Sequence, residues 1–329
     1  MAVLAAMLLL GAASAAEKES SQLVKNLETG KKQTVITYGT SLTKMGAWPD
    51  QLRAVLEQNY PGQVTLINSG QGGSNSAWGR KLFEERVIQK QPDTMIIEFA
   101  INDSVAKRKV SVAQAQENLE AMIDRLQQSN PNAEIILMTM NPCVGYAKVR
   151  RPNLTKYYQM YRDVANARGF KLIDHYRSWE KVLNEDPARF LRYVPDEIHP
   201  VREGALQVIM PNMIESLGLP GGKPELNERM VCWNSMFSSM DKYVKQDKQV
   251  TQTEYDEHWS KNFFNADANK DGVLTVDEYQ AESLFNHIDA NNDASVRLEE
   301  LLKVYAPYFK RFDTNADGKL VAGEIWKIK

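Results

Sequence analysis

The sequence predicts a two-domain protein, with an α/β domain built on a parallel sheet followed by a smaller all-α domain. Three observations lead to this fold class. The chain has 329 residues, a length typical of two domains. Between Thr34 and Leu219, short apolar runs alternate with amphipathic stretches of helical spacing. After the breaker-rich segment 219–224 this alternation stops, and the remaining chain is expected to form helices joined by short polar loops.

Five strands are expected from the apolar runs at 35–38, 64–67, 94–99, 134–139 and 170–173. The helical patterns between them cover 51–56, 77–89, 111–128 and 154–168, and a last helix is expected over 204–217. Alternation of this kind indicates a parallel sheet with helices on both faces. In such sheets ligands bind beyond the carboxyl ends of the strands, so residues that directly follow strands are the first candidates for a site.

The composition excludes several classes of protein. Charged residues make up 25% of the chain, apolar residues 43%, and the net charge is −2. These values argue against wholesale disorder, a collagen-like architecture and a general affinity for nucleic acid. The tail is the acidic part, because 18 acidic and 13 basic residues follow position 225. Two cysteines cannot form a disulfide scaffold or a four-cysteine zinc site, and Cys143 and Cys232 either pair or remain buried thiols.

The first residues have the pattern of an export signal. Residues 1–16 are small and apolar, and the polar chain begins at Glu17. Such a stretch is too short to span a bilayer, and its small residues offer cleavage after Ala15 or Ala16. We therefore expect a signal peptide over 1–16, a lead-in over 17–32, and an exported protein, periplasmic or extracellular, without a transmembrane segment. The alternative is a buried N-terminal helix.

Polar motifs stand at the ends of the first three expected strands. Ser41 lies in Gly-Thr-Ser-Leu-Thr after the first strand, where its hydroxyl faces the edge of the sheet and the next helix supplies N-terminal amides. Gly73 belongs to the loop after the second strand, where a missing side chain lets a backbone amide approach a ligand. Asn102 places an amide donor after the third strand. Alone, Ser41 could equally be a helix N-cap and Gly73 an ordinary turn residue.

A fourth motif, Asp196-Glu-Ile-His199-Pro, precedes the last expected helix. Its three-residue spacing lets a carboxylate hold the imidazole Nδ1 while Nε2 faces outward, which is the geometry that a general base needs. Among the four histidines of the chain, His199 is the one in a catalytic context. His175 follows the fifth strand and is expected to be structural or to contact substrate, whereas His258 and His287 lie in the helical tail.

Together and in this order, the four motifs resemble those of the SGNH hydrolases, also called GDSL esterases, over residues 33–219. The resemblance implies a three-layer, flavodoxin-like fold and a serine esterase that needs no cofactor for its ester chemistry. It makes the serine the nucleophile, the histidine the general base and the aspartate the group that holds the base. By this match the catalytic residues are Ser41, Asp196 and His199, and the oxyanion hole consists of Ser41, Gly73 and Asn102.

Two positions depart from the family pattern. Thr40 replaces the aspartate of the GDSL motif, and Ala100 replaces a glycine before the asparagine. Neither position supplies the nucleophile, the base or an oxyanion donor, so the chemistry is expected to survive. Asp103 is a second candidate for the triad acid, although a structural role in its loop is favoured. Three aromatic residues follow the catalytic blocks and either line an acyl or sugar pocket or pack in the core: Trp48, Trp78 and Tyr146.

The tail contains a twelve-residue motif three times, at 267–278, 289–300 and 313–324. Each copy has Asp, Asn and Asp at positions one, three and five and Glu at position twelve, which are oxygen donors suited to calcium. With aromatic residues and helical runs before each loop, the copies resemble EF-hands more than dockerin repeats. The expected calcium ligands are Asp267, Asn269, Asp271, Val273, Thr275 and Glu278, then Asp289, Asn291, Asp293, Ser295 and Glu300, then Asp313, Asn315, Asp317, Lys319 and Glu324.

The middle motif is expected to bind calcium more weakly than the outer two. It has Ala294 at position six, where the sharp turn favours positive φ and therefore glycine, and Arg297 at position nine. We expect calcium to have a structural or docking role in an EF-hand domain over 227–329, joined to the first domain by a linker over 220–226. A degenerate fourth hand, which would complete two pairs, is indicated by Phe237, Met240, Asp241, Val250, Thr253 and Glu254.

The sequence thus predicts an exported serine esterase acting on carboxylic esters, with O-acetyl groups on carbohydrate as the first substrate class. Two alternatives remain. One is a lipid acyl esterase of the lipase or lysophospholipase type, and the other is a non-catalytic calcium-dependent binding protein on the same scaffold. The expected partners are an ester substrate and calcium, with no nucleic acid.

Overall fold

The computed structural model describes residues 20–222, 240–241 and 247–321; the expected signal peptide, Cys232, Phe237 and Glu324 lie outside these ranges. The first part of the chain contains five parallel strands: β1 (Gln33–Gly39), β2 (Val64–Asn68), β3 (Thr94–Glu98), β4 (Glu134–Thr139) and β5 (Lys171–Asp174). The strand order is β2-β1-β3-β4-β5, so β1 and β3 are neighbours inside the sheet. The predicted parallel sheet is therefore confirmed.

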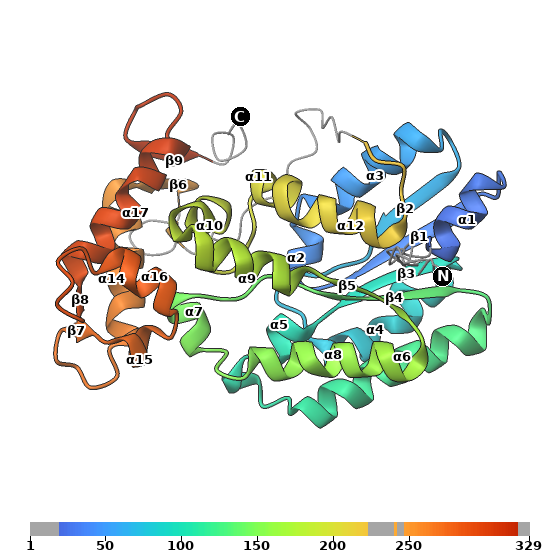
Figure 1. Cartoon of the computed structure of the whole chain (residues 1–329), viewed down its shortest axis with the longest axis horizontal. Helices are drawn as coiled ribbons and strands as arrows, with labels where there is room; N and C mark the ends of the chain where they lie inside the picture. Colours follow the sequence, from blue (N-terminus) through green and yellow to red (C-terminus); the bar gives the residue numbers. More distant parts are fainter. Residues whose placement is uncertain (1–19, 223–239, 242–246, 322–329) are drawn as a thin grey trace, which may run out of the picture.

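Helices cover both faces of the sheet (Figure 1). One face carries α4 (Ser76–Arg86), α6 (Val112–Ser129) and α8 (Leu154–Arg168), and the other carries α3 (Trp48–Asn59), α9 (His175–Glu185) and α12 (Met210–Leu217). The helix expected over 204–217 is divided, because the π-helical η3 (Ala205–Ile209) precedes α12. The remaining elements are α1 (Gln22–Glu28), α2 (Ser41–Lys44), η1 (Ile88–Lys90), α5 (Ala100–Asp103), η2 (Ala106–Arg108), α7 (Gly145–Val149), α10 (Pro187–Tyr193) and α11 (Arg202–Gly204).

The apolar pattern explains these layers. Strand β3 is buried along its whole length, as expected for a parallel strand covered on both faces. Helix α6 begins at a capping box formed by Ser111 and Gln114, which satisfies backbone amides of its first turn. It then packs one apolar stripe against the sheet. The buried residues of that stripe are Ala115, Leu119, Met122, Ile123 and Leu126.

The C-terminal module, as we call the described residues 240–241 and 247–321, is mostly helical. It contains α14 (Gln252–Ala266), α15 (Val276–Tyr279), α16 (Glu282–Ile288) and α17 (Leu298–Phe312). Four short strands form two antiparallel pairs: β6 (Gln249–Thr251) with β9 (Lys319–Val321), and β7 (Val273–Leu274) with β8 (Val296–Arg297). The module lies at one end of the molecule, against α7 and α10 (Figure 1).

The module and the α/β part share one continuous cluster of buried apolar side chains. Polar contacts surround it: Ser283 Oγ donates to Asn184 Oδ1 at 3.0 Å, and Arg311 Nη2 lies 2.5 Å from Glu203 Oε2. The two parts are therefore packed together rather than connected only through the chain. Within the described ranges, no helix combines the length and the apolar character that a bilayer crossing needs.

Candidate functional site

The serine turn lies at the carboxyl end of β1. Strand β1 ends at Gly39, and Thr40 caps the next helix, because its hydroxyl accepts a hydrogen bond from Leu42 N at 3.2 Å. Ser41 is the first residue of α2 and is 8% exposed. The capping role thus belongs to Thr40, and the Ser41 hydroxyl has a different partner.

That partner is His199. Ser41 Oγ lies 2.8 Å from His199 Nε2, and Nδ1 of the same ring lies 2.7 Å from Asp196 Oδ2. In this arrangement the imidazole can take the hydroxyl proton while the carboxylate holds its other nitrogen. The structure therefore brings together the three side chains expected to form the catalytic triad.

The Asp196 carboxylate is held within its own turn. Its Oδ1 accepts hydrogen bonds from Ile198 N at 3.1 Å and His199 N at 2.6 Å. Burial by itself raises the pKa of Asp196, but the imidazole and these hydrogen bonds outweigh burial, and the pKa lies below its ordinary value. The carboxylate is thus ionised at neutral pH. Asn141, just beyond β4, donates to Ile198 O at 2.8 Å and ties the turn to the sheet.

Gly73 and Asn102 follow β2 and β3 at the same edge of the sheet. Gly73 has a φ of 74°, in the left-handed region that favours glycine, and no atom lies within 4 Å of the place that a Cβ would take. Asn102 is 5% exposed and donates from Nδ2 to Ser74 O at 2.8 Å. A primary amide carries two N–H groups, so this bond uses one and orients the other.

Glu98 is a residue of this region that the sequence reasoning missed. It ends β3 and is 1% exposed, and its Oε1 accepts from Thr40 N at 2.7 Å, Thr40 Oγ1 at 2.9 Å and Thr43 Oγ1 at 2.7 Å. Burial raises the pKa of Glu98 to about 7, although the hydrogen bonds from Thr43 and Thr40 oppose that shift. The threonine that replaces the motif aspartate is therefore held by a carboxyl group of the neighbouring strand. The sequence signal for Glu98 was a single acidic residue within the apolar run 94–99.

The second candidate acid and the second candidate histidine have structural surroundings. Asp103 Oδ1 accepts from Ser76 N at 2.8 Å, at the start of α4, and burial raises the pKa of Asp103 to about 6. His175 is fully buried at the start of α9, where burial lowers its pKa to about 3. Its Nδ1 lies 3.3 Å from Asn212 Nδ2. Both side chains thus bond groups within the α/β part.

The three aromatic candidates differ in burial. Trp48 is 1% exposed and donates to Leu42 O at 2.9 Å, so it is a core residue. Trp78 and Tyr146 are partly buried. The ring of Trp78 lies 6.0 Å from that of Tyr38.

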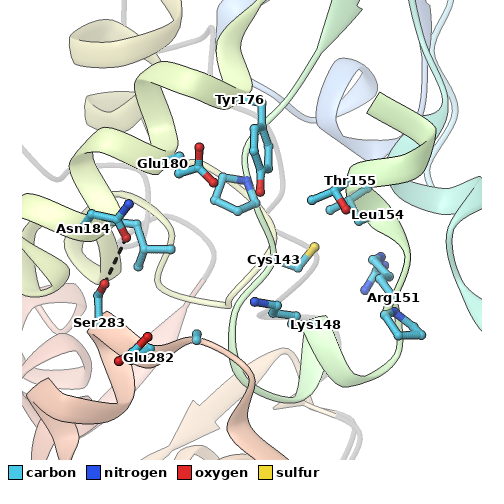
Figure 2. Close-up of a pocket in the computed structure, with 14 residues that line it drawn as sticks. Cys143, Lys148, Arg151, Leu154, Thr155, Tyr176, Glu180, Asn184, Glu282 and Ser283 are labelled. Atoms are coloured by element: carbon cyan, nitrogen blue, oxygen red, sulfur yellow. Dashed lines mark hydrogen bonds between the residues drawn. The ribbon is translucent and has the colours of Figure 1, made fainter. Parts of the chain in front are cut away.

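A cavity of about 200 Å³ lies where the C-terminal module meets the α/β part (Figure 2). Its lining includes Lys148 of α7, Glu180 of α9 and Ser283 of α16. None of the expected catalytic residues lines it, so it is separate from the serine turn. Cys143 lines it as a free, buried thiol whose pKa is raised by burial to about 11. The disulfide alternative for Cys143 is therefore not the state of this structure.

The calcium-type motifs share one loop geometry. The position-one carboxylate accepts from the position-six amide in each: Asp267 from Gly272 N at 3.0 Å, Asp289 from Ala294 N at 2.9 Å and Asp313 from Gly318 N at 2.9 Å. The position-six residue has positive φ throughout, including 62° at Ala294. Alanine thus adopts the turn that glycine makes in the other two motifs, against the steric preference of its Cβ.

The middle motif has a cation of its own. Arg297 Nη1 lies 2.5 Å from Asp293 Oδ2, and Ser295 Oγ donates to Asp293 Oδ1 at 2.6 Å. The Ser295 and Arg297 side chains together hold the pKa of Asp293 well below its ordinary range. The guanidinium therefore occupies the position-five carboxylate that a calcium ion would use.

The described residues before α14 repeat some of these loop hydrogen bonds with a longer spacing. Asp241 Oδ1 accepts from Lys248 N at 2.8 Å and Asp247 Oδ1 from Gln249 N at 3.0 Å, as the position-one and position-five carboxylates do in the other loops. Glu254 accepts from Thr251 N at 2.8 Å, as Glu278 and Glu300 accept from the residues three positions before them. Since β6 pairs with β9, these residues lie beside the third motif, where a degenerate fourth hand was expected.

The donor chemistry of the motifs fits calcium, which prefers carboxylate, amide and backbone carbonyl oxygens. Among the described residues, however, no three His, Cys, Asp or Glu side chains converge as a metal-binding cluster. In the first motif, Glu278 turns to its own loop and accepts from Ala268 N at 3.1 Å and Thr275 N at 3.0 Å.

Comparison with known proteins gives a match for each part of the chain. The GDSL-like lipase/acylhydrolase family matches residues 36–206, and the EF hand matches residues 263–281. Among curated proteins, the uncharacterized lipoprotein YqeF of Bacillus subtilis (strain 168) is 24% identical over 164 residues, covering 46% of this chain. The chain spans 64% of the length of that relative.

Solved structures share the fold of the α/β part. LAE5, an alpha/beta hydrolase enzyme from the metagenome of Lake Arreo in Spain, has a TM-score of 0.51 at 20% identity, covering 58% of this chain and 98% of LAE5. A variant of Axe2, an acetyl-xylooligosaccharide esterase from Geobacillus stearothermophilus, has a TM-score of 0.51 at 18% identity, with coverages of 59% and 98%. At these identities the similarity concerns the fold alone.

Proposed function

The chain belongs to the GDSL-like lipase/acylhydrolase family of ester-hydrolysing enzymes, and on this premise we propose that it is an exported serine esterase with Ser41 as nucleophile. The observation that carries the proposal is the hydrogen-bond chain from Ser41 Oγ through the His199 imidazole to Asp196, with distances of 2.8 and 2.7 Å. A serine hydroxyl becomes an effective nucleophile when an oriented imidazole takes its proton.

In the first half-reaction, Ser41 Oγ attacks the ester carbonyl carbon as His199 Nε2 accepts the hydroxyl proton. Asp196 holds the Nδ1–H group and stabilises the imidazolium. The tetrahedral intermediate collapses when the imidazolium returns its proton to the leaving oxygen, which releases the alcohol and leaves the acyl group on Ser41. Water then attacks this acyl group, giving a proton to His199, and the acid leaves as Ser41 recovers its proton.

The negative charge of each intermediate needs donors aimed at the carbonyl oxygen. We assign the oxyanion hole to the Ser41 amide at the start of α2, the Gly73 amide and the Asn102 side chain. The bond from Asn102 to Ser74 O and the open space beside Gly73 support this assignment. Glu98 has a positioning role in the same site, because it holds the turn on which Ser41 stands.

For the substrate we propose O-acetyl groups on carbohydrate. The loop over 68–75 beside the serine turn consists of small and polar residues, which suit a hydrated sugar better than a long acyl chain. Among fold neighbours, Axe2 is an acetyl-xylooligosaccharide esterase. A lipid ester is the competing outcome, and a comparison of acyl-chain lengths separates the two.

The test compares wild-type protein with Ser41→Ala on a short-chain nitrophenyl ester, and then on acetylated xylooligosaccharides and long-chain esters. We expect hydrolysis that depends on Ser41 and declines as the acyl chain lengthens. Equal rates for wild type and Ser41→Ala would refute the serine mechanism. Preference for long acyl chains would indicate that the substrate is a lipid ester.

We further propose that the motifs at 267–278, 289–300 and 313–324 bind calcium and stabilise a domain spanning 227–329. The oxygen donors at positions one, three, five, seven and twelve would hold the ion, with Thr275 at position nine of the first motif as a further ligand. An ion present at 100 times its dissociation constant stabilises the folded state by about 2.7 kcal/mol per site.

Export through the signal peptide at 1–16 agrees with the lipoprotein nature of the curated relative. The boundaries 33–219 and 220–226 complete the proposed domain organisation.

A further inference from the structure

The turn between Asp196 and His199 contains a buried carboxyl group that reaches the C-terminal module. Glu197 is 3% exposed and has a φ of 67°. Residues with a Cβ rarely adopt this left-handed conformation, so surrounding contacts must hold it. Glu197 Oε1 accepts from the Tyr305 hydroxyl of α17 at 3.2 Å, and Oε2 accepts from Ala147 N of α7 at 3.3 Å.

The α/β part leaves room for this carboxyl group. Gly145, the first residue of α7, lies so close that a Cβ at its position would be 2.0 Å from Glu197 Oε1. The backbone of Glu197 is bonded as well, since its N donates to Val194 O at 3.1 Å and its O accepts from Val144 N at 3.4 Å. Because Asp196 and His199 lie in the same short turn, the contacts that fix the position of Glu197 also constrain the positions of these two residues.

Tyr305 is itself held by the module. It is fully buried, and its ring stacks on Trp259 with a centroid distance of 3.6 Å. The Tyr255 hydroxyl donates to Tyr305 O at 2.9 Å, and the Tyr279 hydroxyl lies 3.5 Å from that of Tyr305. Helices α14, α15 and α17 thus hold the hydroxyl that reaches Glu197.

We propose that Tyr305 and Glu197 are positioning residues through which the C-terminal module holds the catalytic segment, residues 194–201, in its reactive geometry. This inference rests on the proposed function, because it concerns the same acid and base. Burial raises the pKa of Glu197 to about 8. The group is therefore mostly neutral at pH 7 and accepts the tyrosine hydrogen bond without placing a second negative charge beside Asp196.

Tyr305→Phe tests the proposal, since it removes the hydroxyl and keeps the stacked ring. Tyr308→Phe is the matched control. Tyr308 lies on the same helix and its hydroxyl also crosses to the α/β part, but it bonds Ala188 O at 3.0 Å instead of the catalytic segment. On a short-chain nitrophenyl ester, Tyr305→Phe is expected to lower kcat about tenfold with KM within about twofold, whereas Tyr308→Phe changes neither beyond about twofold. Hydrogen exchange over 194–201 should accelerate only in Tyr305→Phe.

Glu197 supplies a second set of variants. Glu197→Gln keeps the shape and an acceptor, so it should lose less activity than Glu197→Ala. Adding Tyr305→Phe to Glu197→Ala should cause no further loss, because the two residues act through one hydrogen bond. If both tyrosine variants match wild type in kcat and in exchange over 194–201, the proposal is wrong even though activity depends on Ser41. If wild type is no faster than Ser41→Ala, the proposed function fails, and the exchange measurement alone decides whether Tyr305 holds the segment.

Discussion

The two parts of this molecule build their candidate sites in opposite ways. In the α/β part, Ser41 and His199 are 158 positions apart and meet only because the chain folds one onto the other at the carboxyl edge of the sheet. In the C-terminal module, each calcium-type motif is a continuous stretch of twelve residues with the same hydrogen bond between positions one and six. A distributed site depends on the whole fold, whereas a local loop depends on its own residues. Substitutions should therefore act on hydrolysis from a distance and on calcium binding one loop at a time.

The largest expected effect is that of Ser41→Ala. Removing the nucleophile should lower kcat for ester hydrolysis by about 10⁴-fold or more, because the imidazole and the oxyanion donors alone give little turnover. Steady-state kinetics on a short-chain nitrophenyl ester measure the loss. Ser178→Ala is the matched control, since Ser178 bonds Asn212 in the helical layer and should keep wild-type activity. A loss of only about tenfold would mean that Ser41 is not the nucleophile.

The next effect is that of Asn102→Ala. Loss of one oxyanion donor should lower kcat about 10²- to 10³-fold with little change in KM, because the donor acts on charge that develops after binding. Single-turnover kinetics would place the loss in the acylation step. Asn141→Ala provides a comparison, since Asn141 bonds Ile198 O and is expected to affect activity only by loosening the acid–base turn. An Asn102→Ala enzyme within about fivefold of wild type would remove Asn102 from the oxyanion hole.

The sequence predicted the order of strands and helices in the α/β part because each strand is a short apolar run bounded by polar or breaker residues. It also placed Ser41, Asn102 and the Asp196–His199 pair at strand ends or before the last helix, where side chains of distant segments come together. Sheet order and the division of the last helix by η3 did not follow from these patterns, because both depend on packing between elements.

Glu98 and Glu197 were missed for a different reason. A buried carboxyl group is stable only with partners, and these partners come from elsewhere in the chain: Thr40 and Thr43 for Glu98, and Tyr305 for Glu197. No local sequence pattern predicts such a pairing. The calcium-type motifs were visible in full because their geometry is local, and even the exchange of glycine for Ala294 left the turn unchanged.

The boundary between the two parts should make stability depend on pH. The folded-state pKa of Glu197, about 8, lies above its ordinary value of 4.5, so folding retains a proton that the unfolded chain releases. The resulting stabilisation is complete below pH 4.5 and is lost as pH rises to about 8. Glu197→Gln does not titrate, so its free energy of unfolding relative to wild type should rise by about 3 to 4 kcal/mol between pH 5 and pH 8.

Denaturant unfolding at both pH values measures this difference. Glu98 and Asp103 also have raised pKa values, but they titrate in both proteins and cancel in the comparison. A constant difference between variant and wild type would mean that Glu197 is ionised in the folded protein over this range.

The smallest expected effect concerns the middle calcium-type motif. Arg297→Thr removes the guanidinium from Asp293 and restores the residue type of the first motif at position nine, so calcium should bind this motif about tenfold more tightly. Calorimetric calcium titration of the full chain measures the change. Lys303→Thr removes an equal charge from α17 outside the motifs and should leave the titration unchanged. Equal shifts in the two variants would indicate a general charge effect rather than release of Asp293.

The central claim is that the turn after β1 carries an activated serine, and covalent labelling tests it most directly. Folded wild-type protein is treated with a fluorophosphonate, digested and analysed by peptide mass spectrometry. The account predicts one adduct, on the peptide that contains Ser41, absent in Ser41→Ala and formed far more slowly in His199→Gln. No adduct in wild type, or an adduct that persists in Ser41→Ala, would contradict it.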